Sequence, residues 1–318
     1  MQRYQRWFQA VVFFLLVALA GSLLPGTYYV TLLNLIGLHI IIVLGLNLLM
    51  GYAGQISLGH AAFFGLGAYA SAILTTTYQV DPLLALLAGL VLSALVAISV
   101  GIPALKLRGY YLAMATLGFG IIVAIALQQL DWLTGGPSGF MGIPPFRLFG
   151  WQFQTPTTGF FLVWTMVGLT LFLSLNIVDS RLGRALRAIH DSETAALAMG
   201  VDAQRLKLLI FVVSALYASL AGSLLAHTVN FLAPSSFGFM FSIKLVTMVV
   251  VGGMASIWGS LLGAAVLTIL PEVLAVFHDL EVVIFGLILM VVMIFLPRGL
   301  VRGLLDLWEC RRRKQGHR

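Results

Sequence analysis

The sequence predicts an all-α integral membrane protein, a polytopic bundle of about ten transmembrane helices. Of its 318 residues, 60% are hydrophobic and only 9% are charged, whereas soluble domains carry about 25% charged residues. The apolar residues form runs close to the roughly 20 residues with which an α-helix spans the hydrocarbon core. These runs do not alternate between apolar and polar positions, which excludes a transmembrane β-barrel.

The runs follow one another along a single transmembrane domain, residues 1–318. We expect spans at residues 8–25, 30–50, 60–77, 83–103, 110–130, 159–178, 207–228, 240–254, 258–276 and 281–297. An even number of spans places both termini on the same side of the membrane.

The basic residues indicate which side that is, because Lys and Arg near the ends of spans stay cytoplasmic. With both termini in the cytoplasm, only Arg147 and Lys244 of the 18 Lys and Arg residues fall elsewhere. This segregation also explains the net charge of +7 as a feature of membrane topology. We therefore expect no binding of nucleic acid.

The first span follows Arg3 and Arg6 and contains Ala18-Leu19-Ala20. This pattern is compatible with a cleavable signal peptide, but the topology works with an uncleaved signal-anchor helix. We expect the helix to be retained.

A polar, glycine-rich break separates the second and third spans, at residues 51–60. It carries Gln55, Ser57 and His60, and Asn47 precedes it. Irregular backbone at membrane depth is tolerated where it is buried in protein or lines a water-filled path. These polar residues are therefore candidates for a translocation path. The alternative is that they form hydrogen bonds between packed helices. No second ligand stands near His60, so we predict no metal site.

Small residues recur at every fourth position in several spans and predict close helix packing in lipid. The rows are Gly89, Ser93, Ala97 and Gly101 in the fourth span, Ser214, Ala218, Gly222 and Ala226 in the seventh, and Ser256, Ser260, Ala264 and Thr268 in the ninth.

Residues 131–158 form a long predicted extracytoplasmic loop after the fifth span. Its aromatic residues are Trp132, Phe140, Phe146, Phe149, Trp151 and Phe153. They could receive a partner protein, or they could form an aromatic belt at the headgroups.

Residues 180–207 are too charged to span the membrane, yet their apolar residues recur near helical spacing. They predict one or two amphipathic helices on the cytoplasmic face. We expect Asp191 to cap the second helix, Gly200 to end it and Asp202 to cap the next span. The segment could lie against anionic lipid through its arginines, or it could dock a cytoplasmic partner.

The eighth and ninth spans meet at a second glycine-rich break, residues 252–260. Such interruptions often mark a transport pathway. Lys244 and Glu272 lie at similar depth in these two spans, so we expect them to form a structural ion pair, since two charges in an apolar environment are less unfavourable together. The alternative is that Lys244 reaches the outer interface.

Four stretches resemble the permease subunits of branched-chain amino-acid ABC importers, and among them the M-type (LivM-like) subunit. They are GLNLLMGYAGQISLGHAAFFGLGAYASAIL, LTGGPSGFMGIP, SRLGRALRAIHDSETAALAMGVDAQRLKL and MVVVGGMASIWGSLLGAAV. The resemblance runs from about residue 30 to 297 in the same order and spacing.

The resemblance implies a multi-pass permease of the bacterial inner membrane, with both termini in the cytoplasm. The implied partners are a second, H-type permease, two cytoplasmic ABC ATPases and an extracytoplasmic substrate-binding protein. Residues 180–207 would be the loop that couples to the ATPases, with the candidate contacts Arg184, Arg187, Glu193, Ala196, Gly200 and Asp202. Within it, Gly200 lies one residue further from Glu193 than in the usual importer pattern. Lys244 also departs from the acidic residue expected there.

The chain contains no G-K-[ST] phosphate-binding loop, so we expect it to bind no cofactor and to be no enzyme, with ATP hydrolysed by its partners. The expected cargo is a branched-chain or other hydrophobic amino acid. A permease for urea or short amides of the same family is the alternative.

Two other classes of membrane protein are alternatives to an importer subunit. An ion-coupled secondary carrier could use Lys244, Glu272 and His60. An intramembrane serine protease could use Ser138, in a G-x-S-G string, with His227. The charged loop at residues 180–207 argues against the carrier, and a short motif in a Pro-rich loop is weak support for the protease.

Overall fold

The computed structural model describes residues 26–107, 109–148 and 151–274, together with single residues between 286 and 299. The predicted first span lies outside the described residues, and the tenth lies almost wholly outside them.

Helices occupy the other predicted spans. They are α2 (Thr27–Asn47), α3 (His60–Thr76), α4 (Pro82–Ala104), α5 (Tyr110–Gln129), α7 (Pro156–Asp179), α10 (Ala203–Val229), α11 (Phe239–Gly252) and α12 (Ile257–Leu274). In the described residues, six helices are long and apolar enough to cross a membrane, and α11 is a shorter apolar helix. The all-α membrane fold is therefore confirmed, whereas the count of about ten spans is not.

Local signals set where several helices begin. The Asp81 side chain accepts a hydrogen bond from Leu83 N (2.9 Å) at the start of α4, where Pro82 occupies the first helical position. Thr155 and Thr158 form a reciprocal capping box at the start of α7. These caps satisfy backbone N–H groups that have no partner within the helix.

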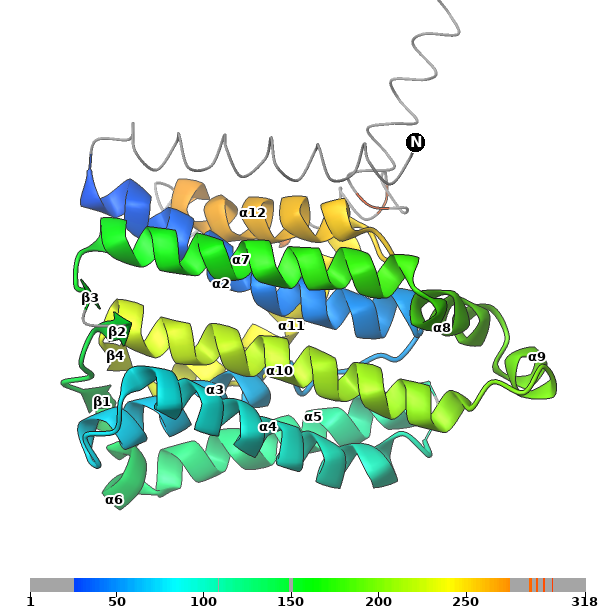
Figure 1. Cartoon of the computed structure of the whole chain (residues 1–318), viewed down its shortest axis with the longest axis horizontal. Helices are drawn as coiled ribbons and strands as arrows, with labels where there is room; N and C mark the ends of the chain where they lie inside the picture. Colours follow the sequence, from blue (N-terminus) through cyan, green and yellow to red (C-terminus); the bar gives the residue numbers. More distant parts are fainter. Residues whose placement is uncertain are drawn as a thin grey trace, which may run out of the picture.

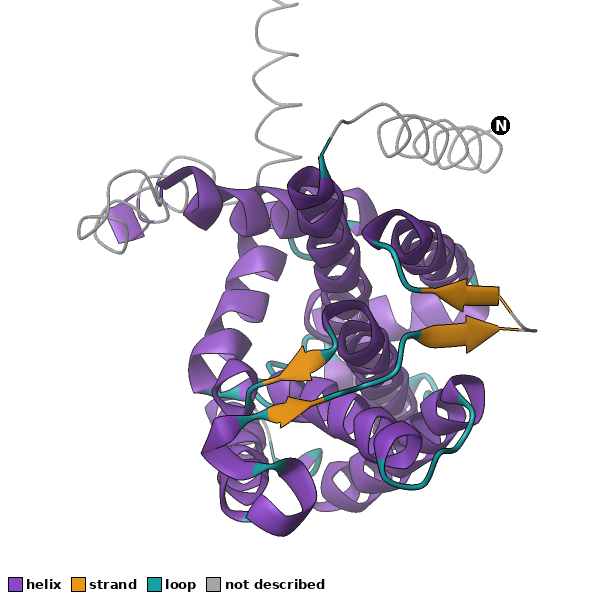
Figure 2. Ribbon diagram, turned by 90° about the vertical axis from the view of Figure 1, so that its left-hand side faces the viewer, coloured by secondary structure: helices purple, strands orange, loops and turns teal. Residues whose placement is uncertain are grey.

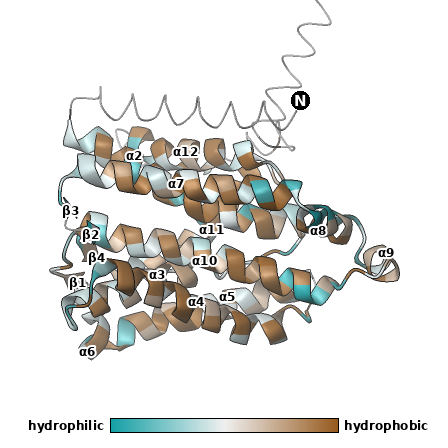
Figure 3. Ribbon diagram, viewed as in Figure 1, coloured by the Kyte–Doolittle hydropathy of each residue, from teal (hydrophilic) through white to brown (hydrophobic). Residues whose placement is uncertain are grey.

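Helix α10 runs through the middle of the bundle and packs against α2, α3 and α4 (Figure 1). Helices α2, α7 and α12 lie on one side of it, and α3, α4 and α5 lie on the other. In the most apolar stretch of α2 and its extension to Tyr52, 83% of the residues are buried, whereas the share is 28% in α4 and 22% in α5. Figure 3 shows apolar residues over these outer surfaces and hydrophilic residues gathered toward the ends. The outward faces of α4 and α5 are thus suited to lipid or to another membrane subunit.

The small-residue rows predicted on α4 and α10 are buried as expected. The need for small residues is clearest between α3 and α10. There, a β-carbon at Gly222 would overlap the carbonyl oxygen of Phe64. Gly67 lies equally close to Ser219 of α10. The two backbones approach so closely because both contact positions lack a side chain.

The two ends of the bundle differ. At one end α8 (Arg181–Asp191) and α9 (Glu193–Ala198) project from it. The other end carries α6 (Asp131–Thr134), η2 (Gly136–Ser138), β1 (Phe140–Met141), β2 (Phe146–Leu148), β3 (Trp151–Phe153), β4 (Phe231–Leu232) and η3 (Pro234–Phe237). Strand β1 pairs with β4 and β2 with β3, both antiparallel (Figure 2). These strands are not predictable from the sequence, because two or three residues are too few to show an alternating pattern.

Candidate functional site

Both predicted breaks are present. Helix α2 continues as the π-helix η1 (Leu48–Tyr52), residues 53–59 form no regular helix, and α3 begins at His60. The second break is the turn at residues 253–256 between α11 and α12. π-Helical turns of this kind are rare and are frequently found at functional sites.

The two breaks meet at Asn47, which is completely buried. Its Oδ1 accepts a hydrogen bond from Ala255 N (3.0 Å), and its Nδ2 donates to Ser256 O (2.8 Å) and Ser260 Oγ (2.7 Å). Ala255 has a left-handed conformation, with φ of 57°, which is unfavourable for a residue with a side chain. Asn47 therefore fastens the end of α2 to the turn, and its amide is fully engaged by protein.

We predict that Asn47→Ala lowers the free energy of unfolding by about 2–4 kcal/mol, since it leaves buried backbone and hydroxyl groups without partners. Thermal unfolding of the detergent-solubilised protein measures this. Ser99→Ala is the control, because the exposed Ser99 Oγ donates to Leu95 O (2.9 Å) within its own turn of α4. Equal melting temperatures for the two variants would show that Asn47 does not hold the turn.

His60 connects the first break to the central helix. Its Nε2 lies 2.6 Å from Ser214 Oγ of α10, and its Nδ1 lies 3.0 Å from Ser57 Oγ. His60 and Ser57 are both buried. The described residues contain no group of His, Cys, Asp and Glu that could hold a metal ion.

Gln55 differs from the other three candidate path residues because it is partly exposed, between the exposed Gly54 and Ile56. Its Nε2 donates to Ala53 O (3.1 Å) within the same segment. Among the four candidates, Gln55 is thus the one whose side chain is accessible without rearrangement of buried hydrogen bonds.

Helix α8 contacts this same break. A β-carbon built on Gly54, which has φ of +68°, would lie 2.7 Å from His190 Nδ1 near the end of α8. The backbone at Gly54 therefore lies directly against α8. Sequence reasoning missed this contact, because nothing in the spacing relates two positions so far apart in the chain.

The projecting segment forms two helices with well-defined ends. Ser192, and not Asp191 as expected, caps α9 by accepting from Ala195 N (3.3 Å), since Asp191 is the last residue of α8. Gly200 has φ of +80°, which suits a glycine just after the end of a helix. Asp202 caps α10 by accepting from Arg205 N (3.1 Å). The last two assignments agree with the sequence prediction.

The candidate coupling residues divide between surface and interior. Arg184 and Arg187 are exposed on α8, whereas Ala196 is buried in a small cluster with Ile189 and Ala203. Glu193 forms a salt bridge with Lys207 Nζ of α10 (2.8 Å), and the Lys207 side chain is only 4% exposed. This ion pair, which the sequence did not suggest, ties α9 to the central helix.

Lys244 and Glu272 are not joined by an ion pair in the described residues. The Glu272 carboxylate instead accepts a hydrogen bond from Tyr28 Oη (2.8 Å) at the start of α2. Their pairing stays a prediction.

His227 does not approach Ser138 through either ring nitrogen. Its Nε2 lies 2.9 Å from Ser71 Oγ and its Nδ1 2.8 Å from Pro144 O. Ser223 donates to Ser71 (2.9 Å), which completes a buried chain between α3, α10 and the loop before β2. The hydrogen bonds of His227 therefore do not form the Ser138–His227 pair that the protease hypothesis requires.

Residues 28–296 match the model of a family described as branched-chain amino acid transport system / permease component. The chain is 34% identical over 311 residues to the high-affinity branched-chain amino acid transport system permease protein LivM of Salmonella typhimurium, covering 90% of this chain and 73% of the relative. Identity is also 34% to LivM of Escherichia coli, covering 93% and 75%. The LivH permease of Escherichia coli is 27% identical, covering 83% and 91%. No solved structure matches.

Proposed function

The chain belongs to the branched-chain amino acid transport permease family, and we propose that it is the M-type membrane subunit of an ATP-driven importer of branched-chain or other hydrophobic amino acids. The observation that carries the proposal is 34% identity to LivM proteins over nine-tenths of the chain. The buried Asn47 and His60 networks, which join the motifs quoted above, are consistent with it. Members of this family are permeases and not themselves enzymes.

The partners we propose are an H-type permease, two cytoplasmic ABC ATPases and an extracytoplasmic binding protein. The similarity to both LivM and LivH supports a pair of related permeases. The exposed outer faces of α4 and α5 leave room for one. ATP is hydrolysed by the partners, and this chain supplies the path.

The orientation we propose places α8, α9 and both termini in the cytoplasm of a bacterial cell, and the strand end on the outside. In this orientation the exposed arginines of α8 face the cytoplasm, as the distribution of basic residues requires. Residues 180–207 are then the docking element for an ATPase, presenting Arg184 and Arg187 together with Met199, which is 84% exposed.

Transport would follow from motion of this docking element. Because α8 lies against Gly54, displacement of α8 moves the irregular segment 53–59, which we propose forms a wall of the path. Gln55 is its accessible polar residue, and Asn47, Ser57 and His60 hold the wall against α10 and the turn at residues 253–256.

Uptake of radiolabelled solutes by proteoliposomes containing the complete complex tests the proposal and separates its two cargoes. We expect ATP-dependent accumulation of leucine, isoleucine or valine in the presence of the binding protein, and none of urea or acetamide. Accumulation of the amides alone would select the alternative cargo. Leucine uptake that follows a proton gradient and ignores ATP would instead indicate a secondary carrier.

A further inference from the structure

Glu193 pairs with a lysine of its own chain, although the sequence suggested it as a contact for an ATPase. Its carboxylate lies 2.8 Å from Lys207 Nζ, and the two side chains are 26% and 4% exposed. At such a position an apolar pair of similar size often gives equal or greater stability, because both charges must leave water to form the ion pair. Stability alone therefore does not explain these two residues. What an ion pair adds is geometry, since it forms only where the two charged groups meet.

The other contact between α9 and α10 is apolar and small. Ala196 is buried in a cluster with Ile189 and with Ala203, the first residue of α10. Apolar contacts are non-directional, so these short side chains do little to set the register between the two helices. Glu193 lies one turn before Ala196, and Lys207 one turn after Ala203. The ion pair thus adds a second, directional contact one turn away from the first.

The register of α9 on α10 also sets the position of α8. Only Ser192 separates the end of α8 at Asp191 from the start of α9 at Glu193. Helix α8 in turn lies against the irregular segment, where a β-carbon on Gly54 would be 2.7 Å from His190 Nδ1. A shift of α9 along α10 would therefore move α8 relative to Gly54.

Helix α10 holds the other end of this irregular segment. His60, which directly follows residues 53–59, places its Nε2 2.6 Å from Ser214 Oγ. Ser214 lies about two turns after Lys207 on the same helix. One end of the segment thus contacts α8 and the other end is bonded to α10, and the ion pair determines how the two ends lie relative to each other.

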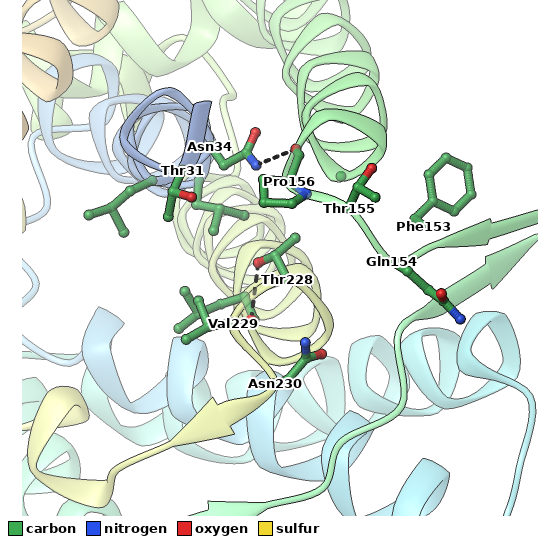
Figure 4. A pocket seen from close by; sticks show the side chains of 13 residues that line it. Thr31, Asn34, Phe153, Gln154, Thr155, Pro156, Thr228, Val229 and Asn230 are labelled. Atoms are coloured by element: carbon green, nitrogen blue, oxygen red, sulfur yellow. Dashed lines mark hydrogen bonds between the residues drawn. The ribbon is translucent and has the colours of Figure 1, made fainter. Parts of the chain in front are cut away.

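The far end of α10 has space beside it. A cavity of about 260 Å³ lies between this end and helices α2 and α7 (Figure 4). Across it, Asn34 Nδ2 donates to Pro156 O (3.1 Å) and joins α2 to α7, whereas Thr228 Oγ1 donates to Leu224 O (2.9 Å) within α10. Close packing resists displacement, so this space makes a tilt of α10 relative to α2 and α7 easier.

We propose that the Glu193–Lys207 ion pair is a positioning contact for transport. It holds α8, α9 and α10 in one register, so that motion of the docking element reaches both ends of residues 53–59 together. In this role neither residue contacts the solute, and Glu193 acts inside this chain rather than on the surface of an ATPase. This role rests on the proposed function and adds a pair of residues to it.

An apolar replacement of the pair separates positioning from stability. The double variant Lys207→Met with Glu193→Leu should melt close to the native temperature. The amount of leucine accumulated per ATP hydrolysed, in proteoliposomes of the complete complex, should nevertheless fall about tenfold. The charge-swapped variant Lys207→Glu with Glu193→Lys should retain more of this ratio than the apolar pair. Arg205→Met, which removes an exposed salt bridge, should keep the native ratio. A native ratio in the apolar variant would overturn the proposal.

A second measurement leaves the ion pair in place. Spin labels are attached at the exposed positions Ala195 of α9 and Leu209 of α10, and pulsed EPR measures their separation in the complete complex. We expect the same narrow distribution without nucleotide and with ATP and vanadate, and a broader one once the apolar pair is introduced. A separation that changes between the two nucleotide states would show that α9 slides on α10, and would overturn the proposal.

Uptake by the wild-type complex separates the two levels of the claim. If ATP drives uptake of neither leucine nor another hydrophobic amino acid, the proposed function itself is wrong. If ATP drives leucine uptake and the apolar variant keeps the native ratio, only the positioning role is wrong.

Discussion

Replacing Gly222 by alanine should destabilise the bundle by about 3 kcal/mol or more, because the added methyl group overpacks the contact between α3 and α10. The β-carbon would overlap Phe64 O and lie 2.9 Å from Ala68 N. Both obstacles are backbone atoms of α3, so neither can rotate away. The two central helices would have to separate. The melting temperature and yield of the purified protein in detergent measure the effect.

Gly89→Ala is the matched control, since it makes the same chemical change in another buried helical glycine. A β-carbon at Gly89 meets its nearest neighbour, Gly67 O, at 3.5 Å, which is an ordinary contact. Alanine also favours helix formation over glycine by about 1 kcal/mol. We therefore expect Gly89→Ala to be as stable as the native protein or slightly more so. If both variants melt alike, close packing at Gly222 does not stabilise the fold.

Lys207→Glu should reduce ATP-dependent transport at least tenfold while leaving the protein in the membrane. The substitution places two carboxylates where Lys207 and Glu193 now lie 2.8 Å apart. Breaking a largely buried ion pair is unfavourable by about 3 kcal/mol. Helix α9 would detach from α10, and the surface that we propose as the docking element for an ATPase would be lost. Uptake by proteoliposomes and the amount of ATPase that copurifies are the two readouts.

Arg205→Glu provides the control for this experiment. Arg205 forms a salt bridge with Asp202 (2.8 Å), but its side chain is 88% exposed, and exposed pairs contribute about 0–1 kcal/mol. The Arg205→Glu variant should therefore retain transport within about twofold of the native value. The double variant Lys207→Glu with Glu193→Lys should recover part of the lost activity. A defect in Arg205→Glu as large as that in Lys207→Glu would mean that charge on the segment matters, and not the buried pair.

The membrane fold was predictable because apolar run length reports directly on helices in lipid. The two breaks were predictable for a related reason, since Gly51, Gly54 and Gly253 disfavour helix within otherwise apolar sequence. The structures of the two breaks also show why their exact backbone conformation was not predictable. Gly51, within the π-helical turn at Leu48–Tyr52, lies directly against Ala255, and nothing in the local sequence reveals a neighbour so far along the chain.

The roles of the polar residues were less predictable. Asn47 and His60 stood out as polar groups in apolar sequence, but only the structure shows that their partners are Ala255, Ser260 and Ser214. Lys207 looked like one more cytoplasmic charge that marks the end of a span. Its burial depends on the fold of α8 and α9, and no periodicity within α10 reveals it.

The most direct test of the central claim is an affinity purification of the tagged chain from native membranes in mild detergent, with mass spectrometry of the proteins that accompany it. It is repeated with residues 180–207 replaced by a flexible linker. We predict that a P-loop ATPase and a second permease accompany the native chain, and that the ATPase is lost with the replacement. A chain that purifies alone in both forms would contradict its assignment as a subunit of an ATP-driven importer.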